Sequence, residues 1–285
     1  MDSAIPTGVG QAAPFTGRFV EAGDLRLHYL DYGTAGRPPM LCIHGGAAHG
    51  HWFDYIAAGF TPDYHVLALD QRGHGDSVWA KDPDYTYLDF ASDIDKAAAK
   101  LDLRDFVLVG HSMGGMVSLV YAATFPGRMS KLVIIDTSIK LSEERLATMR
   151  NVGNRGGSSY ATRDELVARY KLRPGNSLAP QEVVHHIAGF SARQFPDGNW
   201  GHKFDRRVYG TRESLDGMPY WDRVKVPALL VKGGNSERIT PEIFAQVKAR
   251  APQVELVEVA NADHHVTLDN PVGFVKAVKP FLARK

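Results

Sequence analysis

A serine set among glycines is the clearest chemical feature of the sequence. Residues 106–116 read FVLVGHSMGGM, so Ser112 follows an apolar run of β-strand type and precedes a helical pattern. Gly110 and Gly114 permit a tight turn between the two elements, because a side chain at either place would clash with the neighbouring strand or helix. The hydroxyl then stands at a helix N-terminus, where backbone N–H groups favour developing negative charge. The pattern predicts that Ser112 is a nucleophile.

A serine nucleophile needs a base whose pKa lies near neutrality, and histidine is the usual choice. The sequence contains 12 histidines. The segment VANADHHVTLDNPVGF, residues 259–274, follows the last expected strand and precedes the C-terminal helix. A loop in this place would bring His264 or His265 over the turn that holds Ser112.

The elements that must position these groups follow an α/β pattern. From Gly17 onward, short apolar runs alternate with helical stretches, which is typical of a mostly parallel sheet covered by helices. The first two runs alternate in polarity and are expected to form an antiparallel hairpin at one edge. Eight strands are expected, within residues 18–23, 25–33, 39–45, 65–73, 106–112, 131–138, 228–234 and 254–261. The flanking helices are expected within residues 51–60, 90–103, 114–125, 241–251 and 271–285.

The alternation breaks between residues 139 and 224, where helical patterns are followed by an irregular aromatic stretch with no convincing strand. An insertion between the sixth and seventh strands is expected to form a helical cap over one edge of the sheet. The domain prediction is therefore a core of residues 1–138 and 225–285, with a cap of residues 139–224. The candidates for contact with substrate are Gly45 in the core and Trp200 and His186 in the cap.

Four motifs resemble the α/β-hydrolase superfamily in their order and spacing, over nearly the whole chain. They are LCIHGGAAHGHWF, LALDQRGHGDS, LVGHSMGG and ADHHVTLDNP. The resemblance implies that His264 is the base and that the backbone N–H groups of Gly46 and Met113 form the oxyanion hole. Gly45 and Gly46 would let the backbone approach the reacting carbonyl group closely, which agrees with that role.

The acid that holds the histidine is where the sequence departs from the usual pattern of that superfamily. The common Gly-x-x-Asp after the seventh strand is replaced in VKGGNSERITPE, where Ser236 takes the place of the acid and Glu237 follows. Asp136 ends the sixth expected strand, beside the nucleophile strand, and some branches of the superfamily carry their acid there. We favour Asp136, and Glu237 remains the alternative.

The resemblance implies an enzyme that cleaves carboxylic esters, with lactones as a further substrate class and a small or medium apolar acyl group. A serine at the nucleophile position argues against the dehalogenase and epoxide-hydrolase chemistries of related folds, which need a carboxylate there. Two alternatives remain: hydrolysis of a carbon–carbon bond in a diketone, and a slow-turnover ligand receptor. We expect no cofactor and no metal site, because no histidine pair has the spacing of a metal motif.

The bulk composition gives little information about partners. The chain has 33 basic and 32 acidic side chains and a formal charge of +1, so neither nucleic acid nor an anionic membrane is an expected partner. The single cysteine and the lack of a recognisable export signal lead us to expect a cytoplasmic protein. The expected partner is a small-molecule ester or lactone, and the sequence leaves open a monomer or a homodimer.

Overall fold

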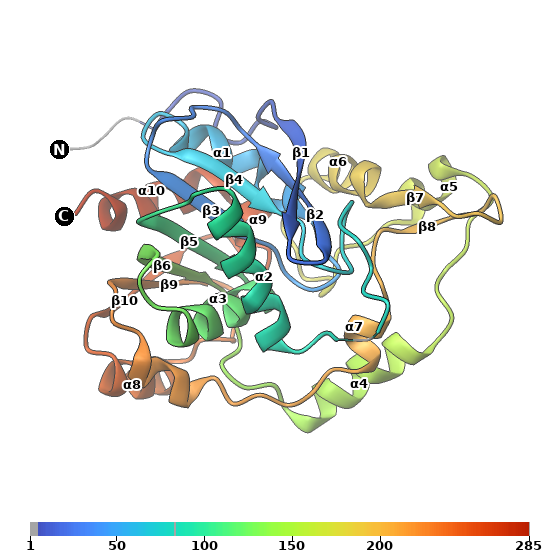
Figure 1. Cartoon of the computed structure of the whole chain (residues 1–285). Helices are drawn as coiled ribbons and strands as arrows, with labels where there is room; N and C mark the ends of the chain where they lie inside the picture. Colours follow the sequence, from blue (N-terminus) through green and yellow to red (C-terminus); the bar gives the residue numbers. More distant parts are fainter. Residues whose placement is uncertain (1–4, 83, 285) are drawn as a thin grey trace.

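An eight-stranded sheet forms the centre of the computed structural model, which describes residues 5–82 and 84–284 (Figure 1). Its strand order is β1-β2-β4-β3-β5-β6-β9-β10. Strand β2 pairs antiparallel with both neighbours, and the other pairs in this sheet are parallel. The predicted fold class is therefore confirmed. The strands are β1 (Thr16–Ala22), β2 (Leu25–Asp31), β3 (Pro39–Ile43), β4 (His65–Leu69), β5 (Phe106–His111), β6 (Met129–Ile135), β9 (Ala228–Gly233) and β10 (Val254–Val259).

Helices cover both faces of the sheet (Figure 1). One face packs against α2 (Tyr87–Lys100), α3 (Met113–Thr124) and α8 (Pro241–Arg250). The other packs against α1 (Asp54–Phe60), α9 (Val266–Asp269) and α10 (Pro271–Leu282), with the short 3-10 helix η1 (Gly50–Phe53) leading into α1.

Successive residues of a central strand face opposite layers. In β6, Leu132 and Ile134 belong to the first layer, whereas Val133 and Ile135 belong to the second. A strand buried on both faces needs this continuous apolar composition. Within the described ranges, no helix combines the length and the apolar content that crossing a membrane requires.

The chain between β6 and β9 forms the segment predicted as a cap. It contains α4 (Glu143–Asn154), α5 (Arg163–Arg169), α6 (Gln181–Ser191), β7 (Ala192–Gln194), β8 (Trp200–His202), α7 (Arg207–Gly210) and the 3-10 helix η2 (Met218–Arg223). Helices α4 to α7 lie to one side of the sheet (Figure 1). Helix η2 instead packs with α3 and α8, and its Trp221 is buried in the layer that those helices form.

The prediction that this segment holds no strand was wrong. Strands β7 and β8 form an antiparallel pair, and Tyr160 adds a further bridge to Trp200. The turn between the two strands places Gly198 at φ +86°, a conformation that glycine adopts readily. Each strand has only three residues, too few for an alternation of polar and apolar side chains to be recognised in the sequence.

Candidate active site

Ser112 lies at the sharp turn between β5 and α3, as the sequence indicated. Its φ of +55° is uncommon for a residue with a side chain, and its backbone N–H donates to the Ile135 carbonyl in the neighbouring strand (2.9 Å). A Cβ atom added at Gly114 would lie 2.3 Å from the Ile43 carbonyl oxygen, and one at Gly110 would lie 2.4 Å from Ser118 Oγ. Both glycines are therefore required by close approach, to β3 on one side and to α3 on the other.

His264 lies in the loop after β10 and is bonded to Asp136, at the end of β6. The ring donates from Nδ1 to Asp136 Oδ2 over 2.8 Å. Both side chains are buried, with 4% of His264 and none of Asp136 exposed. A neutral imidazole with its proton on Nδ1 has an unprotonated Nε2, which is the form that a general base requires.

Three further groups surround the Asp136 carboxylate. Ser236 Oγ donates to Oδ2 (2.8 Å), the Gly233 N–H donates to Oδ1 (3.2 Å), and Arg238 Nε lies 3.3 Å from Oδ2. The serine at the usual position of the acid is thus a hydrogen-bond donor to the carboxylate that comes from the adjacent strand. Glu237 is exposed, and no hydrogen bond joins it to His264 among the described residues.

The surroundings of this pair shift both titrations. Burial lowers the pKa of His264 well below its usual value, and the positive charges of Arg238 and Arg145 act in the same direction. Burial raises the pKa of Asp136, while the hydrogen bonds from Ser236 and Gly233 oppose that rise. The ring is therefore held neutral near pH 7, as a proton acceptor must be.

The serine and the histidine line one cavity. Among the described residues no hydrogen bond joins Ser112 Oγ to the His264 ring, and such contacts often tighten only when substrate binds. The backbone of His264 is held from the nucleophile turn itself, because His111 donates from Nε2 to the His264 carbonyl oxygen (2.8 Å). The sequence reasoning missed His111, although it directly precedes Ser112.

Gly45, Gly46 and Met113 line the same cavity beside Ser112. A Cβ added at Gly45 would lie 3.1 Å from Ser112 Cβ, so the backbone after β3 passes close to the nucleophile. Met113 is the first residue of α3, where N–H groups have no partner within the helix. Tyr209, from the segment predicted as a cap, packs against the loop at Gly46, since a Cβ there would lie 2.8 Å from Tyr209 Oη.

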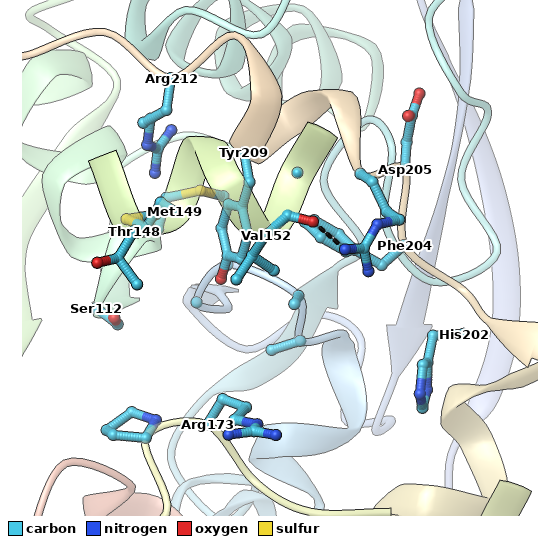
Figure 2. Close-up of a pocket in the computed structure, with 18 of the residues that line it drawn as sticks. Ser112, Thr148, Met149, Val152, Arg173, His202, Phe204, Asp205, Tyr209 and Arg212 are labelled. Carbon is cyan, nitrogen blue, oxygen red and sulfur yellow. Dashed lines mark hydrogen bonds between the residues drawn. The ribbon is translucent and has the colours of Figure 1, made fainter. Parts of the chain in front are cut away.

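The cavity has a volume of about 940 Å³ and lies between the nucleophile turn and the cap (Figure 2). Its wall includes Phe195, Phe204 and Tyr209 from the cap. Trp200 and His186 are not part of this wall, so the cavity gives no support to the prediction that they contact substrate.

Each of those two side chains has a structural role instead. Trp200 packs in a small apolar cluster of the cap with Leu166 and Ala188. The ring of His186 donates from Nε2 to Asp54 on α1 (2.7 Å), which ties helix α6 to the core. Aromatic and histidine side chains in the cap are thus divided between its own packing and the cavity.

Among the described residues, two clusters outside the cavity have the donor types and proximity of a metal site. They are His51 with Asp54 and His186, and His28 with Asp70 and Asp76. In the first cluster both histidines are hydrogen-bonded to Asp54 Oδ2, and in the second the His28 ring is bonded to Asp70 (2.8 Å). In each cluster one histidine, His186 or His28, is distant in the sequence from the other two members, so motif spacing does not reveal either cluster.

Comparison with known proteins agrees with this architecture. Residues 38–271 match the family model described as alpha/beta hydrolase fold. A 2-(acetamidomethylene)succinate hydrolase of Mesorhizobium japonicum is 27% identical over 277 residues, which cover 94% of this chain and 95% of that protein. An esterase of Mycobacterium tuberculosis is 28% identical over 295 residues, covering 99% and 93%.

A solved structure extends the likeness to three dimensions. The crystal structure of an E-2-(acetamidomethylene)succinate hydrolase superposes with a TM-score of 0.82 at 26% identity, covering 95% of this chain and all of that one. The family match spans most of the chain, and it includes the nucleophile turn and the His264 loop. The chain therefore belongs to the alpha/beta hydrolase family and is a hydrolase.

Proposed function

We propose that this hydrolase cleaves carboxylic esters, lactones included, through an acyl-enzyme formed on Ser112. The observation that carries the proposal is the 2.8 Å hydrogen bond from His264 Nδ1 to Asp136 Oδ2, on a ring that lines the same cavity as Ser112. A histidine fixed in this way is the base that a serine hydroxyl requires. The esterase of Mycobacterium tuberculosis among the relatives supports the same reaction.

In the proposed mechanism, Ser112 Oγ attacks the carbonyl carbon while His264 Nε2 takes the hydroxyl proton. The carbonyl oxygen becomes an oxyanion, which accepts hydrogen bonds from the N–H groups of Gly46 and Met113. Collapse of this intermediate breaks the bond to the alcohol, which leaves with the proton from His264. Water then attacks the acyl-enzyme in the same way and restores the serine. Asp136 keeps the ring in the correct tautomer and stabilises its protonated form.

Amide hydrolysis is a second candidate, and one observation favours it. The hydrolase of Mesorhizobium japonicum is named for a substrate with an acetamido group. The same serine, base and oxyanion donors serve both reactions, because His264 can protonate an amine leaving group as it does an alkoxide. Esters and amides of one acyl group therefore belong in the same substrate panel.

The test is multiple-turnover hydrolysis of a panel that contains 4-nitrophenyl esters, a lactone, an N-acyl amide and a diketone. Ser112→Ala is expected to lower kcat by at least about 10³-fold. Ser214→Ala is the matched control, because Ser214 is exposed and lies outside the cavity wall. Both variants are checked for folding by circular dichroism.

The outcomes separate the alternatives. Turnover of the diketone in preference to every ester would replace the proposal with carbon–carbon bond hydrolysis. A single burst of product without turnover would instead favour a ligand receptor. Ester hydrolysis that survives Ser112→Ala would exclude the acyl-enzyme mechanism.

A further inference from the structure

The wall of the active-site cavity is strongly basic. Nine lysine and arginine side chains line it, and Asp205 is the one carboxylate residue among the described residues of that wall. The whole chain carries a formal charge of only +1, so the excess of positive charge is local to the site. A basic cavity attracts anions and raises their local concentration.

Several of these cations already have a carboxylate partner. Arg169 pairs with Glu165 (3.2 Å), Arg207 pairs with Asp205 (2.6 Å), and Arg238 lies beside Asp136 (3.3 Å). Their charge is at least partly neutralised within the protein. These three arginines are therefore weaker candidates for binding an anionic ligand than the cations without a carboxylate partner.

Arg212 differs from them in both burial and partners. Only 2% of its surface is exposed, and its Nε and Nη1 atoms are buried without a hydrogen-bond partner. Within residues 5–82 and 84–284 it forms no ion pair, and its clearest contact is the face of the Tyr87 ring, 4.4 Å away. A guanidinium withdrawn from water without an anion is costly, so such a group is rarely retained without a function.

We propose that Arg212 binds a negatively charged group, a carboxylate or a phosphate, of the molecule that Ser112 attacks. This inference rests on the proposed function, and it replaces the expected apolar acyl group with an anionic substrate. The guanidinium presents paired N–H donors that match two oxygens of such a group. The two paired edges of the group are Nε with Nη2 and Nη1 with Nη2, and each edge includes one of the unpartnered nitrogen atoms.

The position of Arg212 fits a substrate that spans the cap and the core. Arg212 and Tyr209 extend into the cavity from the same segment of the cap (Figure 2). The backbone N–H of Arg212 donates to the Tyr209 carbonyl oxygen (3.2 Å). The Tyr209 hydroxyl reaches the backbone at Gly46, and the adjoining Gly45 approaches Ser112. An anion held by Arg212 would therefore lie in the same cavity of about 940 Å³ as the nucleophile.

The experiment measures binding and does not depend on turnover. Succinate, inorganic phosphate and neutral succinamide are titrated by calorimetry into the full chain carrying Ser112→Ala. Arg212→Met is then added to that protein, with Arg223→Met as the matched control, since Arg223 is exposed and outside the cavity wall. We expect one or both anions to bind, Arg212→Met to weaken that binding roughly 10- to 100-fold, and Arg223→Met to leave it unchanged.

The comparison of succinate with phosphate identifies the preferred group. The proposal is overturned if neither anion binds, if succinamide binds as well as succinate, or if Arg212→Met binds the anions as tightly as its parent. If the anions bind but the enzyme hydrolyses none of the esters in the panel, only the proposed reaction is contradicted. If the enzyme hydrolyses esters but binds neither anion, only the proposed role of Arg212 is contradicted.

Thermal unfolding separates a binding role from a structural one. Because the buried charge has no partner, Arg212→Met is expected to keep or raise the Tm. A lower Tm together with unchanged anion binding would assign Arg212 to structure and overturn the proposal. Arg212→Lys is the second variant if the methionine protein does not fold. It retains the charge without the paired donors, and it should bind the anion more weakly than the parent.

Discussion

Replacing Asp136 with asparagine tests which carboxylate holds the His264 ring. In the structure Oδ2 accepts hydrogen bonds from His264 Nδ1 and Ser236 Oγ, each at 2.8 Å, and Oδ1 accepts from the Gly233 N–H at 3.2 Å. Asparagine has one acceptor oxygen and one NH₂ group, so it cannot accept hydrogen bonds on both sides. Each orientation of the amide therefore breaks a different contact.

The two orientations have different costs. If the amide nitrogen faces His264, the ring must accept and carries its proton on Nε2, the atom that has to take the serine proton. The loss of the correct tautomer and of the negative charge is expected to lower kcat about 10⁴-fold, equivalent to about 5.4 kcal/mol. If the nitrogen faces Gly233 instead, the amide NH₂ group and the Gly233 N–H are two donors facing each other in a buried site. This arrangement should lower the free energy of unfolding by about 1–3 kcal/mol. Glu237→Gln alters an exposed side chain and should change kcat by no more than about twofold.

The assay is kcat for the best substrate of the panel, with circular dichroism and Tm on each variant. A double variant, Asp136→Ser with Ser236→Asp, exchanges the two residues. It should recover part of the activity, because Ser236 Oγ lies only 2.8 Å from Asp136 Oδ2, so a carboxylate at position 236 would lie close to where the native one lies. Retention of wild-type activity by Asp136→Asn, together with loss of activity in Glu237→Gln, would refute the assignment of the acid.

Two further predictions concern the base and the oxyanion donor. The acid limb of kcat/KM should have its midpoint below about 6.5, because burial lowers the pKa of His264 and a base with a lowered pKa stays neutral to lower pH. Arg145→Met removes one of the charges that lower this pKa, so the midpoint of the acid limb should move to higher pH. The shift should be smaller at high salt, which screens the charge. A midpoint above 6.5 in the unmodified enzyme would contradict the burial argument. Gly46→Ala should lower kcat, by up to about 10³-fold if the N–H is displaced, because its Cβ would lie 2.8 Å from Tyr209 Oη. Adding Tyr209→Ala should restore part of the rate in steady-state assays, and no restoration would mean that the clash is not the cause.

The parts of this site that the sequence could predict are those set by local patterns. The nucleophile turn depends on glycines within two residues of Ser112, and the apolar runs that form the sheet are equally local. Asp136 could be favoured because it follows the strand next to the nucleophile strand, and the carboxyl ends of neighbouring parallel strands lie at the same edge of the sheet. The hydrogen bond from Ser236 to Asp136 joins residues 100 positions apart, and no periodicity or motif reports such a contact.

The roles of residues in the segment predicted as a cap could not be assigned from the sequence, for a related reason. A partly buried Trp200 and a His186 in a helical segment have the composition of a substrate pocket, but the same composition serves packing within the cap and its attachment to Asp54. Which role applies depends on how short elements fold back on one another. Arg212 could not be singled out either, because its distinction is the lack of a partner, which only the three-dimensional arrangement reveals.

The position of the acid follows from the strand order. Strands β6 and β9 are neighbours in parallel register, with Ile135 beside Val231, so the residues that follow them, Asp136 and Ser236, emerge at the same edge of the sheet. A carboxylate on either strand end can then reach the loop that carries His264, provided that the other end supplies a donor and no competing charge. Ser236 is such a donor. The core therefore holds the groups proposed for the reaction, whereas the cap supplies Arg212 and Tyr209. It follows that changes at Arg212 should alter which substrates are accepted without altering the chemical step.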